Sequence, residues 1–144
     1  MKEEERKRIL NKLNEMINYV DELKEMLPSK KEYLDNLIKR RACEKTIEIA
    51  IETMIDVAAL IVSAEKIGFP TGEENIFDLL YKNKILDREI CEKAKKMKGF
   101  RNILIHRYTD VDDEIVYENL KNSLNDFYYF VDKIKEYLKK IKNF

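Results

Sequence analysis

The sequence has few of the residues that interrupt helices: three glycines and two prolines in 144 residues. No segment alternates apolar and polar residues for long enough to predict a β-strand. Apolar side chains make up 44% of the chain and recur instead at the three- and four-residue spacing of helices. We therefore predict an all-α fold, and the length fits one domain that spans residues 1–144.

Cysteine is also scarce, since Cys43 and Cys91 are the two thiols of the chain. Two isolated cysteines provide neither a disulfide framework nor a zinc site, so we expect small buried thiols and no metal or cofactor. No apolar run approaches the length of a membrane span, and the N-terminal residues MKEEERKRIL lack the apolar stretch of a signal peptide. We therefore expect a cytoplasmic protein.

Net charge is absent as well, because 28 basic residues balance 28 acidic ones. A protein that binds nucleic acid over its whole surface is normally strongly basic, so a nucleic-acid site here must be a local patch. One candidate is the segment from Lys93 to Thr109, which has no acidic residue. Its cations are Lys93, Lys95, Lys96, Lys98, Arg101 and Arg107. Such a run is typical either of a solvated helix face or of a positive field that attracts a polyanion.

The first two predicted helices are separated by Pro28, which cannot continue a helix. Ser29 and Glu32 have the spacing of a capping box, which begins a second, long helix that runs to Gly68 and Pro70. One apolar stripe on each helix is predicted to face the core. These stripes are Ile9, Leu13, Met16, Val20, Leu23 and Leu27 on the first helix, and Leu34, Ile38, Ile49 and Leu60 on the second.

Three further helices are predicted: a short one at residues 74–82, one capped by Asp87, and a last one that begins at the acidic residues 110–114. The expected core residues of the last two are Ile90, Ala94, Met97, Leu104, Ile115, Leu120, Leu124, Phe127, Val131, Ile134, Leu138 and Ile141. The aromatic segment NDFYYF, residues 125–130, keeps this core spacing, so we predict packing rather than stacking on bases. The whole pattern predicts a single all-α bundle.

His106 is the only histidine of the chain and lies within the basic segment. A histidine gives or takes a proton near neutral pH, and the guanidinium of Arg101 offers a planar fork for a phosphate. Cleavage of RNA needs both functions, and RNA supplies its own nucleophile in the 2′-hydroxyl, so no metal is required. The competing interpretations are structural: His106 caps the end of the helix, and Arg101 pairs with the acidic residues 110–114.

The spacing of Arg101 and His106 sets a geometric condition. On an ideal helix the two side chains lie roughly 140° apart, whereas Asn102 and His106 share one face. Asn102 therefore either orients His106 or caps backbone groups. A site that uses both Arg101 and His106 needs a second copy of the motif across a two-fold axis, so we expect a homodimer. Because both side chains lie near a helix end, we expect them to be accessible to solvent.

Residues 101–108, RNILIHRY, fit an R-x4-H-x-Y pattern, through which the chain resembles the HEPN superfamily and in particular the HepT-like toxins. Residues 40–62 look like the long second helix of that family, and residues 68–86 like its connecting region, so the resemblance covers essentially the whole chain. It implies a homodimer of antiparallel bundles of four to five helices that acts as a metal-independent endoribonuclease. Arg101 and His106 would be catalytic, and Asn102 would support them.

Partners and control also follow from the resemblance. RNA would be the substrate, and we expect Lys95, Lys98 and Arg107 to contact its backbone. A nucleotidyltransferase antitoxin of the MntA type would silence the toxin by attaching AMP to Tyr108, whose alternative role is simple packing. Some members of the superfamily are binding modules. The second hypothesis is therefore an inactive helical module that docks a nucleotidyltransferase or presents its substrate.

Overall fold

The computed structural model of the protein describes residues 1–106 and 111–142, apart from the side chains of Glu74 and Lys142. The described residues form no strand, and the predicted all-α fold is confirmed. Their six helices are α1 (Glu3–Met26), α2 (Lys30–Asp35), α3 (Leu37–Glu65), α4 (Glu73–Lys82), α5 (Arg88–Ile105) and α6 (Asp113–Lys142).

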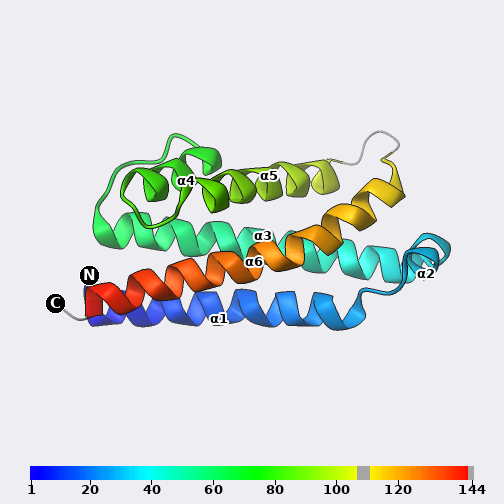
Figure 1. Ribbon diagram of the computed structural model, residues 1–144, viewed down its shortest axis with the longest axis horizontal. Coiled ribbons are helices and arrows are strands. Elements are labelled where there is room, and N and C mark those ends of the chain that lie inside the picture. The colour runs from blue at the N-terminus through cyan, green and yellow to red at the C-terminus, as the bar shows by residue number, and fades with distance from the viewer. Residues whose placement is uncertain (107–110, 143–144) are drawn as a thin grey trace.

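The long helices α1, α3 and α6 run along the molecule, and α4 and α5 pack against each other and against α3 (Figure 1). In chain order α1, α3, α5 and α6 alternate in direction, as an antiparallel bundle requires. Both chain termini therefore lie at one end of the bundle. The opposite end carries α2, the end of α5 and the start of α6, and this is where Arg101, Asn102 and His106 lie.

The second predicted helix is in fact two helices, because the chain leaves the helical conformation at Asn36 (φ −119°, ψ 101°). The side-chain oxygen of Asn36 accepts a hydrogen bond of 3.0 Å from the backbone N–H of Lys39 and so caps α3. Ser29 caps α2 through the N–H of Glu32, as predicted. The Glu32 carboxylate, however, binds Lys39 rather than closing the predicted capping box.

The predicted core stripe is correct for α1 and only partly correct for the second predicted helix, where Leu34 and Leu60 pack partly buried against the core. On α1 every predicted position from Ile9 to Leu23 is buried. On α3, Ile38 is 82% exposed, and Ile49 and Leu60 are only partly buried. The buried apolar residues of α3 are instead Cys43, Ile47, Ala50, Ile51, Met54, Ile55, Val57, Ala58, Ile61 and Val62. Since α3 packs against α1, α2, α4 and α5, it is covered on several sides, and a single stripe does not describe its interior.

The aromatic segment 125–130 is core, as predicted. Phe127 and Phe130 are fully buried. The hydroxyl of Tyr128 donates to Asp21 at 2.7 Å, and that of Tyr129 donates to Asp87 at 2.5 Å. These bonds tie α6 to α1 and to the cap of α5, so the segment holds three helices together.

The remaining core predictions have one clear exception. Ile115, at the start of α6, is 59% exposed, although the predicted positions further along this helix are buried or partly buried. Cys43 and Cys91 are buried free thiols, as predicted. Burial raises the pKa of the Cys91 thiol to about 11, which keeps it protonated and unreactive at neutral pH. Across residues 1–106 and 111–142, no helix combines the length and the apolar character that spanning a membrane requires.

Candidate functional site

Arg101 lies on the buried face of α5. This helix begins at Asp87, whose carboxylate accepts a hydrogen bond of 2.9 Å from the N–H of Ile90. Its buried face continues through Ala94 and Met97, and Arg101 follows at the next helical position. Arg101 is accordingly only 8% exposed. The expectation that its side chain is accessible to solvent is wrong, because the helix end still packs against α4.

The partner of Arg101 is Glu73, the first residue of α4. The Arg101 Nη2 lies 2.6 Å from Glu73 Oε1, and Nη1 lies 3.1 Å from Glu73 Oε2, so the pair is bidentate. The structural alternative that the sequence suggested, a pair with the acidic residues 110–114, does not describe this contact. Within that segment, Asp113 binds Arg40 and Glu114 binds Lys30.

The electrostatics of Glu73 follow from this pair. Hydrogen bonds from Arg101 hold the pKa of the Glu73 carboxyl below its ordinary value of 4.5. Partial burial acts in the opposite direction, and the charges of Arg101 and Lys98 lower the pKa further. Glu73 is therefore ionised at neutral pH and neutralises the Arg101 guanidinium across the α4–α5 interface.

Asn102 connects Arg101 with the end of the helix. Its side-chain oxygen accepts hydrogen bonds from Arg101 Nε at 3.3 Å and from Nη2 at 2.9 Å. Its backbone carbonyl accepts a bond of 3.0 Å from the N–H of His106, which is the C-cap residue of α5. The Asn102 side chain, which was predicted either to orient His106 or to cap backbone groups, binds the Arg101 guanidinium instead.

His106, the C-cap residue of α5, is exposed as predicted and follows the buried Arg101 by five positions in the chain. The structure brings Arg101, Asn102 and Glu73 into one hydrogen-bonded group and places His106 at the end of the same helix. Arg107 and Tyr108, predicted as an RNA contact and as the site of modification, lie outside the described residues.

The basic segment is less positive in three dimensions than in the sequence. Lys95 contacts Asp78 of α4 at 3.1 Å. Lys93 contacts Glu89 at 3.1 Å and Asp126 of α6 at 3.4 Å. These partners raise the pKa of both lysines, in each case chiefly through the nearest carboxylate. Acidic residues from α4 and α6 thus compensate cations that have no acidic neighbour among residues 93–109.

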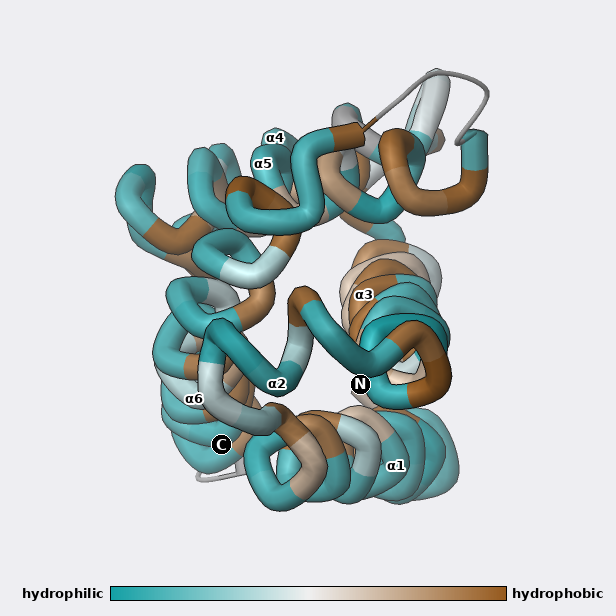
Figure 2. The backbone as a smooth tube through the Cα atoms, turned by 90° about the vertical axis from the view of Figure 1, so that its right-hand side faces the viewer, coloured by the Kyte–Doolittle hydropathy of each residue, from teal (hydrophilic) through white to brown (hydrophobic). Residues whose placement is uncertain are grey.

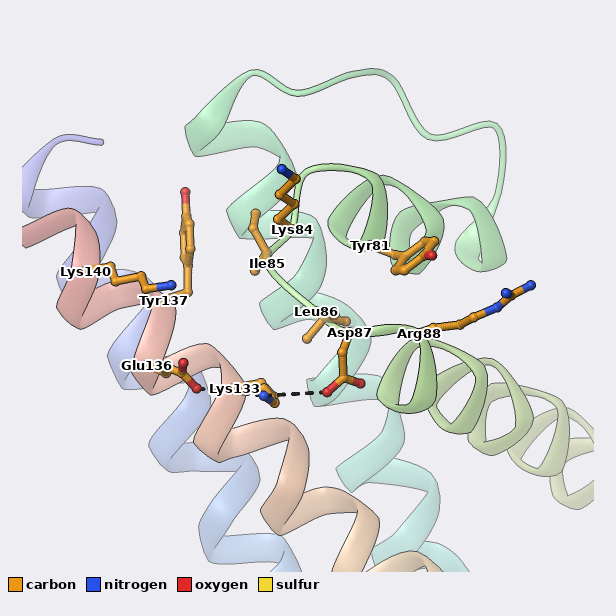
Figure 3. Close-up of a pocket in the computed structure, with 10 residues that line it drawn as sticks. All are labelled: Tyr81, Lys84, Ile85, Leu86, Asp87, Arg88, Lys133, Glu136, Tyr137 and Lys140. Carbon is orange, nitrogen blue, oxygen red and sulfur yellow. Dashed lines mark ion pairs between the residues drawn. The ribbon is translucent and has the colours of Figure 1, made fainter.

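A cavity of about 480 Å³ lies at the opposite end of α5 (Figure 3). It is lined by the end of α4, the start of α5 and the C-terminal part of α6, and an ion pair of 3.5 Å between Lys133 and Asp87 crosses it. From Arg88 in its wall to Arg101, α5 rises about 20 Å. The cavity is therefore separate from the motif. The described parts of the chain contain no cluster of three or more His, Cys, Asp or Glu side chains that could hold a metal ion.

Glu73 is the residue of this site that the sequence did not reveal. Its signal is indirect: α4 and α5 form an antiparallel hairpin, and Glu73 and Arg101 lie equally far in sequence on either side of Asp87. Nearly the same spacing brings Asp78, nine residues before Asp87, to Lys95, eight residues after it. Recognising Glu73 from the sequence alone requires knowing that the two helices pack against each other in this register.

Comparisons with known sequences agree over most of the chain. A model of the family described as "Ribonuclease HepT-like" matches residues 16–134. The chain is similar to the "mRNA nuclease HepT" of Shewanella oneidensis, with 25% identity over 127 residues that cover 88% of this chain and 96% of that protein. It is also similar to the "tRNA nuclease HepT" of Aphanizomenon flos-aquae, with 28% identity over 121 residues, 83% of this chain and 82% of that protein.

Comparisons with solved structures concern the fold. A tri-AMPylated HEPN toxin of Shewanella oneidensis, solved in complex with an MNT antitoxin, superposes with a TM-score of 0.84 and 24% identity, over 94% of this chain and 99% of that chain. A variant of an MntA–HpeT toxin–antitoxin complex gives a TM-score of 0.81 and 25% identity, over 89% of this chain and 98% of that chain. The arrangement of the helices is therefore that of a known toxin fold.

Proposed function

Because the chain belongs to the family of HepT-like ribonucleases, we propose that it is the toxin of a toxin–antitoxin pair, an endoribonuclease that cleaves RNA without a metal ion in the cytoplasm. The observation that carries this proposal is the pairing of a proton-transfer group with a phosphate-binding group at the end of α5. His106 is exposed there, and Arg101 is held five residues before it.

In the proposed reaction, the 2′-oxygen of RNA attacks the adjacent phosphorus. His106 accepts the proton of the 2′-hydroxyl, and an N–H of Arg101 stabilises the charge that develops on the phosphoryl oxygens. The bond to the 5′-oxygen breaks, and this oxygen takes up a proton as it leaves. The products are a 2′,3′-cyclic phosphate and a 5′-hydroxyl. One histidine does not both accept and donate a proton in a single step, so a site with two copies of His106 suits this reaction.

A homodimer supplies the second histidine. Support comes from the end of the bundle that carries the end of α5, which faces the viewer in Figure 2. Of the eight large hydrophobic side chains that are exposed in the described residues, five belong to this end: Leu37, Ile38, Ile103, Ile105 and Ile115. Exposed apolar surface of this kind marks an interaction site, and a two-fold contact there places two motifs next to each other.

The proposed dimer is tested by the substitution Ile103→Lys. Ile103 is 53% exposed, so a lysine there is tolerated in the monomer but carries two charges into a two-fold interface. We expect the wild-type protein to sediment as a dimer at micromolar concentration and the variant as a monomer with lower RNA cleavage. Tyr81→Lys, at an exposed residue of α4, serves as the control. A wild-type monomer would count against the two-copy site.

RNA binding is assigned to the cations around the motif. We propose backbone contacts from Lys95, Lys98 and Arg107. Lys95 is partly exposed and exchanges its contact with Asp78 for an RNA phosphate. The phosphate and the Asp78 carboxylate are both anions, so replacing one by the other as the partner of Lys95 requires little free energy.

Control is assigned to Tyr108, two residues after His106. A nucleotidyltransferase antitoxin of the MntA type would attach AMP to its hydroxyl, and the adduct's phosphate would neutralise the cations that bind RNA. Co-expression with such an enzyme and ATP should add AMP mass to the peptide that contains Tyr108 and abolish RNA cleavage. Tyr108→Phe should stay unmodified and active. An adduct on another tyrosine, or silencing of Tyr108→Phe by an active antitoxin, would contradict this assignment.

The function itself is tested with purified protein and total RNA in the presence of chelator. We expect the wild-type protein to cleave and His106→Ala to lose about 10²–10⁴-fold in rate. Lys139→Ala, at an exposed residue of α6, should cleave normally. The alternative function, a binding module without nuclease activity, has one observation in its favour: Arg101 is already bound to Glu73. Binding of a nucleotidyltransferase by a wild-type protein that does not cut RNA would establish that alternative.

A further inference from the structure

The Arg101 guanidinium has little hydrogen-bonding capacity left. An arginine side chain carries five N–H groups. One bond from Nη1 and one from Nη2 go to Glu73, and one from Nη2 and one from Nε go to Asn102. Within the part of the chain that the structure describes, a single N–H, on Nη1, is left for a ligand. Arg101 therefore cannot form a bidentate hydrogen bond to a phosphate while it remains bound to Glu73.

The contact fixes Arg101 more firmly than packing requires. Two parallel bonds define the plane and the rotation of the guanidinium, and the bonds to Asn102 fix its other edge. The Arg101 side chain is 10% exposed, whereas that of Glu73 is 41% exposed, so the carboxylate reaches inward to the arginine from the protein surface. Asn102 joins this group to the backbone of His106. Glu73 is thus the far end of a chain of contacts that leads to the motif histidine.

We propose that Glu73 is a positioning residue of the ribonuclease site, which holds the Arg101 guanidinium so that its remaining Nη1–H meets a phosphoryl oxygen of RNA. The inference rests on the function proposed above and adds a residue outside the R-x4-H-x-Y motif. A donor that is already oriented needs no rearrangement as charge develops on the phosphoryl group, and this is the main source of electrostatic catalysis. Misplacement of a catalytic group by about 1 Å costs on the order of 10²-fold in rate.

The Glu73 carboxylate has a second, opposite effect on the substrate. A negative charge beside Arg101 reduces the attraction of the site for the RNA backbone. Removal of this charge while the shape is kept should therefore separate two kinetic constants. In Glu73→Gln, kcat falls because the guanidinium is no longer held by two bonds, whereas KM stays the same or falls because a like charge is gone. A residue with a purely structural role changes neither constant once the protein is folded.

The test compares the wild-type protein with Glu73→Gln and Asp126→Asn. Asp126 also binds a cation of α5, Lys93, but from α6 and away from the motif. Initial rates on a short RNA oligonucleotide with chelator give kcat and KM. The NMR signal of the Arg101 Nε–H, assigned by its absence in Arg101→Lys, reports the hydrogen bonding of the guanidinium. We expect Glu73→Gln to lower kcat at least tenfold without raising KM and to shift this signal, and Asp126→Asn to change none of the three.

Two outcomes overturn the proposal for different reasons. If the wild-type protein cleaves RNA and Glu73→Gln has an equal or higher kcat, Glu73 does not position Arg101, and a lower KM together with that kcat means that Glu73 competes with RNA for Arg101 instead. If the wild-type protein does not cleave RNA at all, the proposed function fails and the positioning role fails with it. Circular dichroism at the assay temperature confirms that Glu73→Gln is folded, and Glu73→Asp, which keeps the charge, should recover part of kcat.

Discussion

Lys95 and Arg101 are both cations of α5 that bind a carboxylate of α4, but the two contacts differ in burial and geometry. Lys95 reaches Asp78 through one contact of 3.1 Å and keeps 29% of its side chain exposed. Arg101 binds Glu73 through two bonds and is 10% exposed. An exposed ion pair contributes about 0–1 kcal/mol to the free energy of unfolding. A buried charge, in contrast, destabilises the fold when its partner is removed. One cation can therefore exchange its partner for RNA, and the other is fixed in place.

The largest expected difference between the two residues is in the chemical step. Arg101→Lys keeps the positive charge but loses the planar fork, so we expect kcat for RNA cleavage to fall about 10²–10³-fold. Arg88→Lys, an exposed arginine at the start of the same helix, should leave kcat unchanged. Lys95→Ala should leave kcat nearly unchanged while raising KM, and it should reduce the dependence of binding on salt by about one phosphate contact. Equal losses of kcat in Arg101→Lys and Lys95→Ala would show that both cations act in the chemical step.

A smaller difference is expected in the free energy of unfolding. Arg101→Ala removes a buried side chain and leaves Glu73 without its partner, so we expect a loss of about 2–4 kcal/mol. Lys95→Ala should cost less than about 1 kcal/mol. Urea unfolding at pH 7, followed by circular dichroism, measures both values. A loss below about 1 kcal/mol for Arg101→Ala would mean that its stem and its ion pair contribute no more than those of an exposed lysine.

The smallest expected effect is the pH dependence of the Arg101–Glu73 pair. The pKa of Glu73 is lowered in the folded protein, so the pair stabilises the fold above the ordinary value of 4.5 and loses this effect as the pH falls through the lowered pKa. The stability difference between the wild-type protein and Glu73→Gln should be greatest at pH 7 and shrink below pH 4.5. Thermal unfolding of both proteins between pH 3 and pH 7 measures it. A difference that stays constant over this range would show that the Glu73 charge does not stabilise the fold.

The sequence by itself determined the helical class and most helix ends. Pro28 ends α1, Ser29 caps α2 and Asp87 caps α5, because these residues act on backbone groups only a few positions away. The buried stripe of α1 could be predicted for the same reason, since one side of this helix faces the core. The break at Asn36 could not, because an asparagine within a helical pattern is equally compatible with an uninterrupted helix.

The motif at residues 101–108 was visible in the sequence, and a family resemblance gave it a meaning. The state of its arginine was not visible. Burial of Arg101 and its bond to Glu73 depend on the packing of α4 against α5, which are connected by the turn at Asn83–Asp87. Local sequence spacing does not predict which carboxylate of α4 contacts Arg101. The same folding brings Asp78 and Asp126 to the lysines of an acid-free segment. Local interactions fixed the helices, whereas the pairing of charges far apart in the chain was decided only by how those helices pack.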